Sequence, residues 1–200
     1  MKLLEFKFTL PPWVADFIDR SPQIFATVED RMDFAIELSR KNIENGDGGP
    51  FGAAVFDVDG RLIAPGINLV TLENCSILHA EMVAIAMAQK ILGRFDISDG
   101  GKYAFDLYAT TEPCAMCFGA VVWSGVRRLV CGARKQDAEA IGFDEGPKPD
   151  NWISELKARG IDVIIDVGRE KATAVLDDYV KKGGVIYNTG GKTIFPLNYA

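Results

Sequence analysis

Two short segments, His79-Ala80-Glu81 and Pro113-Cys114-Ala115-Met116-Cys117, strongly limit the folds open to this chain. Apolar residues recur at helical spacing after each segment, over 79–92 and 114–124, so each segment stands at the expected start of a helix. Side chains in the first turn of a helix point past its end, and two adjacent helix starts therefore converge on one point. The fold must bring these two distant segments together.

His79, Cys114 and Cys117 would supply one imidazole and two thiolates at that point, which is a donor set suited to zinc. The partial positive charge of a helix N-terminus also favours the thiolate form of both cysteines. Three protein ligands leave the fourth tetrahedral position open, as in catalytic zinc sites, where the pKa of a bound water falls toward about 7. Glu81 can reach such a water without displacing a ligand, and we expect it to carry protons.

Other uses of these residues are weaker interpretations. A structural site would need a fourth ligand, and Cys75 and Cys131 are the cysteines that remain, one in a loop and one in an apolar strand. A thioredoxin-like Cys-x-x-Cys would make the adjacent His-Ala-Glu a coincidence. The catalytic metal site is favoured.

The remaining pattern alternates strands and helices. Asp59-Gly60 between two apolar runs predicts a hairpin. We expect strands at 3–9, 51–57, 62–70, 104–110, 127–131 and 161–167, and helices near 12–18 and at 28–45, 79–92, 114–124, 150–159 and 169–182. This order indicates a layered α/β domain with helices on both faces of the sheet. One domain over residues 1–200 is expected, with its core at about 28–145.

The composition of the chain limits the classes of partner that we expect it to bind. The formal net charge is -6 and the pI is near 4.9, with no cluster of basic residues, so nucleic acid is an unlikely partner. The N-terminus has no signal-peptide core, and no apolar run reaches the roughly 20 residues of a membrane helix. We expect a cytoplasmic protein whose four cysteines serve metal binding, catalysis or burial rather than disulfides.

The His-x-Glu and Pro-Cys-x-x-Cys pattern is the signature of zinc deaminases. With Gly49-Pro50-Phe51-Gly52 and Pro65-Gly66-Ile67-Asn68 in the same order, residues 28–145 resemble the cytidine/deoxycytidylate deaminase superfamily. The resemblance implies a three-layer α/β/α sandwich around a mixed five-stranded sheet, a homodimer, and one catalytic zinc in each subunit. It also implies that Glu81 shuttles protons while an amino-heterocycle loses ammonia.

Within the superfamily the chain is similar to bacterial guanine deaminases, through the segments Glu112-Pro113-Cys114, 120–123 and 140–145. That similarity implies guanine as the substrate, with guanine-like aminotriazines such as ammeline as side substrates. By position it assigns Asn68, Ala80, Trp123 and Phe143 to substrate binding and Glu145 to a second proton transfer. Tyr199 is the weakest of these assignments, as part of a C-terminal tail that could close the partner's site.

Three alternatives remain open. A tRNA adenosine deaminase shares the core motif, but the acidic net charge disfavours it. Cytidine or cytosine deamination uses the same zinc chemistry and is disfavoured by the Glu-Pro-Cys and Phe-Asp-Glu segments. A non-catalytic zinc-binding interaction module would have no need of Glu81.

Overall fold

The computed structural model describes residues 6–188, and within this range it contains one mixed five-stranded sheet. β1 is antiparallel to both of its neighbours, whereas β3, β4 and β5 run parallel. The strands are β1 (Gly52–Asp57), β2 (Leu62–Ile67), β3 (Phe105–Thr111), β4 (Arg128–Ala133) and β5 (Asp162–Ile164), in the spatial order β2-β1-β3-β4-β5.

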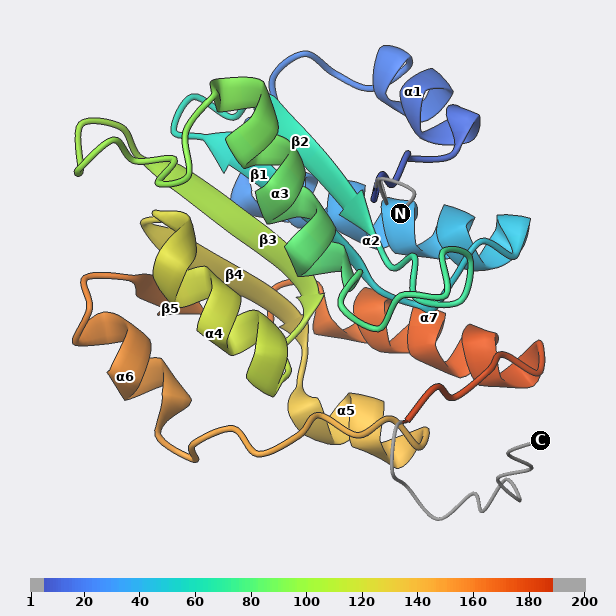
Figure 1. Ribbon diagram of the computed structural model, residues 1–200. Coiled ribbons are helices and arrows are strands. Elements are labelled where there is room, and N and C mark those ends of the chain that lie inside the picture. Colours follow the sequence, from blue (N-terminus) through green and yellow to red (C-terminus); the bar gives the residue numbers. More distant parts are fainter. Residues whose placement is uncertain (1–5, 189–200) are drawn as a thin grey trace, which may run out of the picture.

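Helices cover both faces of this sheet, so the α/β/α sandwich is confirmed (Figure 1). The helices are α1 (Pro12–Asp19), α2 (Val28–Asn45), α3 (Ala80–Leu92), α4 (Ala115–Ser124), α5 (Lys135–Ala140), α6 (Trp152–Lys157) and α7 (Arg169–Lys181). α3, α4 and α6 lie on one face, and α1, α2 and α7 lie on the other. In residues 6–188 no helix combines the length and apolar character that crossing a membrane requires.

Two apolar cores result from the alternation of side chains along each strand. On β1, Ala54 and Phe56 face α2 and α7, while Ala53 and Val55 face α3 and α4. β3 and β4 alternate in the same way. A strand that is buried on both faces has no polar side, which explains why these segments are continuous apolar runs in the sequence.

The strand ends that matter for function lie together at one end of the sheet. Since β1 runs antiparallel to β2 and β3, its start lies beside the ends of both. The parallel strand β4 ends at the same edge as β3. Phe51, Asn68, the turn after Thr111 and the loop after α5 therefore meet there, at the carboxyl ends of the parallel pair, where open α/β sheets place their ligands.

The structure corrects some of the expected elements. Residues 6–9 of the strand expected at 3–9 are not in a strand, and residues 3–5 lie outside the described residues. β2 ends at Ile67 rather than at 70, because the chain turns at Asn68 to begin the loop before α3. α5 was not expected from the sequence: it is one short, mainly polar helix without apolar periodicity.

A buried ionic cluster fastens α2 to the sheet. The fully buried carboxylate of Asp106 on β3 lies 3.8 Å from Arg31 of α2 and 3.6 Å from Arg127, and it also contacts Arg128. The Arg31 side chain is itself buried, and its Nε donates to the Phe25 carbonyl. Removal of Asp106 would leave this guanidinium buried without a counter-charge.

We expect Asp106→Asn to lower the free energy of unfolding by about 3–5 kcal/mol, the usual cost of breaking one side of a buried ion pair. Urea denaturation measures this loss. The matched control is Asp33→Asn, which removes the exposed pair between Asp33 and Lys171 and should cost less than about 1 kcal/mol. Equal losses in the two variants would contradict the role of the buried cluster.

Candidate active site

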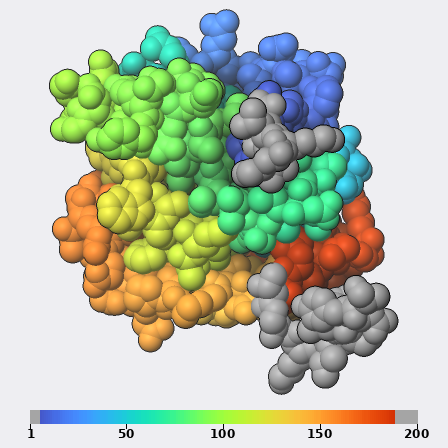
Figure 2. Space-filling view, viewed as in Figure 1, coloured from blue at the N-terminus to red at the C-terminus, as the bar shows by residue number. Residues whose placement is uncertain are grey.

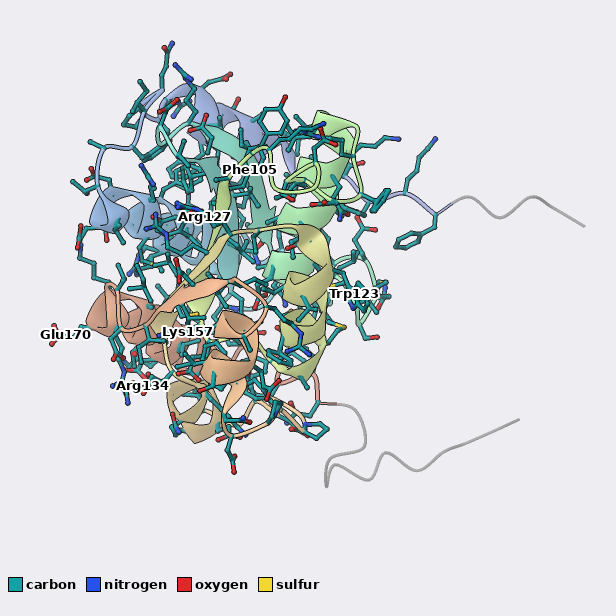
Figure 3. The ribbon with its side chains drawn as sticks, turned by 90° about the vertical axis from the view of Figure 1, so that its left-hand side faces the viewer. Phe105, Trp123, Arg127, Arg134, Lys157 and Glu170 are labelled. Atoms are coloured by element: carbon teal, nitrogen blue, oxygen red, sulfur yellow. The ribbon has the colours of Figure 1, made fainter. Side chains whose placement is uncertain are left out.

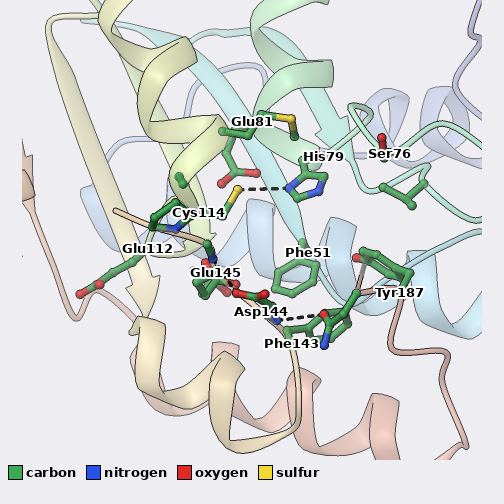
Figure 4. Close-up of a pocket in the computed structure, with 17 residues that line it drawn as sticks. Phe51, Ser76, His79, Glu81, Glu112, Cys114, Phe143, Asp144, Glu145 and Tyr187 are labelled. Carbon is green, nitrogen blue, oxygen red and sulfur yellow. Dashed lines mark hydrogen bonds between the residues drawn. The ribbon is translucent and has the colours of Figure 1, made fainter. Parts of the chain in front are cut away.

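Two helix N-termini form the base of the site. His79 is the N-cap of α3 and Cys114 is the N-cap of α4, each with an extended backbone and no capping bond from its own side chain. An N-cap side chain usually accepts from the first turn of its helix. Here both side chains point toward each other instead, as Figure 4 shows.

His79, Cys114 and Cys117 present ligand atoms that all lie within 4.8 Å of one another. The Nδ1 atom of His79 is 3.5 Å from Sγ of Cys114 and 3.7 Å from Sγ of Cys117. Cys117 is fully buried in the first turn of α4. One imidazole and two thiols at this spacing fit a tetrahedral zinc ion and leave one coordination position to the cavity.

The three ligand side chains shift one another's pKa values. The interaction with the Cys117 thiol is the largest cause that lowers the pKa of Cys114 to about 4, against the effect of burial. The same interaction, together with burial, raises the pKa of Cys117. Burial disfavours the charged form of His79, but the hydrogen bond with Cys114 and the charge of Glu81 outweigh it and raise the pKa of the imidazole.

Glu81 lies in the first turn of α3 with its carboxyl buried beside the ligand cluster (Figure 4). Burial raises the pKa of this carboxyl, and the negative charge of Cys114 raises it further. A raised pKa makes a carboxyl a stronger base, which favours the uptake and return of a proton in general acid–base catalysis.

The cluster opens into a cavity of about 410 Å³, a size typical of small-molecule sites. One wall is aromatic: Phe143 packs edge-on against Phe51 with ring centroids 4.9 Å apart and against Tyr187 at 5.0 Å. The chain that carries Phe143 continues to Asp144 and Glu145, which also line the cavity. An aromatic wall therefore faces a cluster of ionisable groups.

Glu145 is the second buried carboxyl of the cavity, and its backbone carbonyl accepts from the amide of Ala115, next to Cys114. Burial raises the pKa of Glu145 to about 8, and the negative charges of Cys114 and Glu81 contribute in the same direction. Between its ordinary pKa of 4.5 and about 8, the folded protein keeps a proton that the unfolded chain has lost. Stability of the metal-free protein therefore falls as the pH rises through this window.

Glu145→Gln should remove the loss of stability that ionisation of this buried carboxyl causes as the pH rises. In chelator-treated protein we expect the variant to match the parent near pH 4.5 and to exceed its stability by about 1–3 kcal/mol near pH 9. Urea denaturation at the two pH values measures the difference. Glu139→Gln, at an exposed position of α5, is the control and should show no such trend. A constant difference between Glu145→Gln and the parent at both pH values would count against the buried carboxyl.

Asn68 and Ala80, expected to bind substrate, are fully buried and do not line the cavity; their neighbours Val70, His79 and Glu81 do. Oδ1 of Asn68 accepts from the amides of Gly49 and Val70, whereas Nδ2 has no partner among residues 6–188. An unpaired buried donor is costly and rare unless a ligand or water satisfies it. Ala80 is the first residue of α3, where a backbone amide has no partner within the helix.

Trp123 is placed differently from the other expected substrate residues. Its side chain is 80% exposed on the outer side of α4, and it does not line the cavity. Figure 3 shows it at the periphery of the molecule, and Figure 2 shows α4 (yellow) at the surface beside α3 (green). Helical periodicity turns Trp123 away from Cys117, so this residue does not reach a base in the cavity of its own subunit.

Several residues at the site were not found from the sequence, and two of them, Tyr187 and Lys148, make contacts that shape it. Tyr187 lines the cavity, and its hydroxyl occupies the space where any side chain at Gly49 would have to stand. Lys148 is buried behind the turn that carries Cys114. Neither stands in a periodic segment or a motif, so no local signal marks them. Tyr199, the tail residue considered above, lies outside the described residues.

Comparisons of this chain with known proteins agree with this geometry. A family model for the cytidine and deoxycytidylate deaminase zinc-binding region matches residues 26–133. Guanine deaminase of Bacillus subtilis is 40% identical over 111 residues, 56% of this chain and 67% of that protein. The tRNA-specific adenosine deaminase of the same organism is 43% identical over 102 residues, which are 51% of this chain and 59% of that protein.

A solved structure with bound 2,6-diaminopurine is 50% identical and superimposes with a TM-score of 0.84, covering 91% of this chain and 96% of its own. The likeness therefore extends beyond the zinc-binding region to almost the whole described fold. The family match and the clustered ligands His79, Cys114 and Cys117 agree, and the chain belongs to the cytidine and deoxycytidylate deaminase zinc-binding family.

Proposed function

We propose that this protein deaminates guanine, with water as co-substrate and xanthine and ammonia as products. The observation that carries the proposal is the combination, in one cavity, of the ligand cluster, the two buried carboxyls Glu81 and Glu145, and an aromatic wall. The relative named guanine deaminase and the neighbour with bound 2,6-diaminopurine support a purine base. Aminotriazines such as ammeline share the amino-amide edge of guanine and are proposed as side substrates.

A zinc ion held by His79, Cys114 and Cys117 would lower the pKa of a bound water toward about 7. Glu81 takes a proton from the attacking water and delivers it to a ring nitrogen, which makes C2 of guanine electrophilic. The hydroxyl group adds to C2, its remaining proton is transferred to the amino nitrogen, and the bond from C2 to that nitrogen breaks, which releases ammonia and leaves a carbonyl at C2. We assign this second transfer to Glu145, and we assign contact with the substrate ring to Phe51 and Phe143; all three residues line the cavity.

A tRNA substrate is the second candidate, because tRNA-specific adenosine deaminases share the core. It fits less well: binding an anticodon arm needs several phosphate contacts, and the chain carries a formal net charge of -6. Ammonia release should be measured with guanine, adenine, cytosine, cytidine, ammeline and an anticodon stem-loop. Turnover of guanine to xanthine supports the proposal, whereas turnover confined to another substrate would replace it.

Asn68 is proposed to donate its free Nδ2 hydrogen bond to the substrate ring. Asn68→Asp keeps the acceptor for Gly49 and Val70 but removes the donor, and we expect it to raise KM for guanine by about 10–100-fold, the value of one buried hydrogen bond. Steady-state kinetics measure the change. Asn42→Asp, which alters a neighbouring buried amide that bonds only backbone carbonyls, is the control for general disturbance of this loop. Unchanged KM in Asn68→Asp would exclude the contact.

The resemblance to a homodimeric superfamily leads us to propose that the outer side of α4 pairs with a second copy of the chain. α4 buries few of its own side chains, and Trp123 is the most exposed large residue on it. Trp123→Glu should therefore convert a dimer into a monomer, which sedimentation equilibrium measures. A parent protein that is monomeric at micromolar concentration would refute the pairing.

A further inference from the structure

Lys148 has the most deeply buried ammonium group near the site. Its side chain is only 2% exposed, although Pro147, Pro149 and Asp150 around it are exposed. Nζ donates to the carbonyl of Pro113 at 2.8 Å, lies 3.6 Å from the carboxylate of Glu112 and stands 4.5 Å from the centre of the Trp152 ring. The ammonium group therefore makes one hydrogen bond, one ion pair and one cation–π contact. A charge is buried in this way only where its partners are fixed.

Those partners belong to the part of the chain that presents the metal ligand Cys114. Glu112 and Pro113 directly precede Cys114, and Figure 4 shows Glu112 beside the turn. Glu112 is in turn tied to the sheet, since its amide donates to the carbonyl of Ala133 at 2.8 Å. The bond from Lys148 to Pro113 is therefore made to the peptide unit that leads into the ligand.

The loop of Lys148 also carries Glu145. The amide of Ala115, on the other side of Cys114, donates to the carbonyl of Glu145 at 2.9 Å, and the amide of Lys148 donates to Gly146. Cys114 is thus held from both sides by one loop, through Pro113 before it and Ala115 after it. Without Lys148 only the Ala115 bond would remain between the loop and this turn among the described hydrogen bonds.

We propose that Lys148 is a positioning residue of the metal site, which locks the Glu112–Cys114 turn to the Glu145 loop and so fixes the direction of the Cys114 sulfur. Groups that orient a ligand from outside the coordination shell commonly change metal affinity by 10–100-fold when they are removed. The inference concerns retention of zinc and holds whichever base is the substrate, so its test is independent of the guanine assay.

The experiment compares the rate of zinc transfer from the zinc-loaded protein to an excess of a coloured chelator. Lys148→Met removes the charge and the donors but keeps an unbranched apolar stem, and Lys148→Arg keeps the charge. Lys171→Met removes an exposed, paired lysine on α7. Asp106→Asn destabilises the fold at the opposite end of β3 and reports how far zinc loss follows global stability.

We expect Lys148→Met to release zinc at least 10-fold faster than the parent, Lys148→Arg to lie between them, and Lys171→Met and Asp106→Asn to stay within about 2-fold of the parent. Release from Lys148→Met at the parental rate would overturn the proposal, and so would equal acceleration in Asp106→Asn. If Lys148→Met does not fold, zinc release from Glu112→Gln tests the proposal instead. That variant leaves Lys148 only Pro113 and Trp152, and zinc release from it at the parental rate would likewise overturn the proposal.

Discussion

Glu81→Gln is expected to lower kcat for guanine by roughly 10³-fold or more while zinc stays bound, because the transfer of a proton from the attacking water to the ring nitrogen passes through this carboxyl. The glutamine has the same shape and can still hydrogen-bond, but it cannot carry a proton. Burial raises the pKa of the Glu81 carboxyl, so the neutral amide should fit its surroundings at least as well as the carboxylate does. The melting temperature should therefore not fall.

Single-turnover kinetics and metal analysis of the same preparation test this prediction. Glu139→Gln changes an exposed glutamate of α5 and is the matched control, with full activity expected. A loss in Glu81→Gln that follows loss of zinc would assign Glu81 to metal binding instead of proton transfer. Activity within about tenfold of the parent would mean that another group, such as Glu145, performs the transfers.

The parts of the fold that the sequence predicted are those with local causes. α2 spans Val28–Asn45 as expected, because Thr27 and Asp30 form a capping box at its start and Gly46 ends it with a positive φ of 74°. α5 has only six residues, too few for an apolar period, and its start is fixed by Arg134 and Asp137. The expected strand near the N-terminus had alternation, but residues 6–9 have no strand partner in the described structure.

The residues of the site also separate into those that the sequence predicted from local motifs and those that it did not. His79, Glu81, Cys114 and Cys117 stand in two short motifs whose helix starts fix their direction, so the sequence alone indicated that they meet. Lys148 and Tyr187 enter the site through tertiary contacts between loops, which leave no spacing in the sequence. The substrate role of Trp123 was inferred from resemblance. Its outward position follows from the way α4 packs on the sheet.

Loss of one zinc ligand is the second change that we expect to have a large effect on activity. We expect Cys117→Ala to abolish stoichiometric zinc binding and all detectable deamination, because two remaining ligands no longer define a tetrahedral site. Cys131→Ala is the matched control: Cys131 is equally buried, on β4, but belongs to no metal cluster among the described residues. It should keep one zinc per chain and its activity, although both variants lose a buried thiol.

Chelation separates the metal's contribution to folding from the cavity that the alanine creates. Zinc that binds only the native state stabilises it by mass action, so a chelator should lower the melting temperature of the parent and of Cys131→Ala. Cys117→Ala should melt at the same temperature with and without the chelator, since it has no zinc to lose. A chelator-induced shift that persists in Cys117→Ala would mean that the stabilising ion lies elsewhere, and the assignment of His79, Cys114 and Cys117 as its ligands would fail.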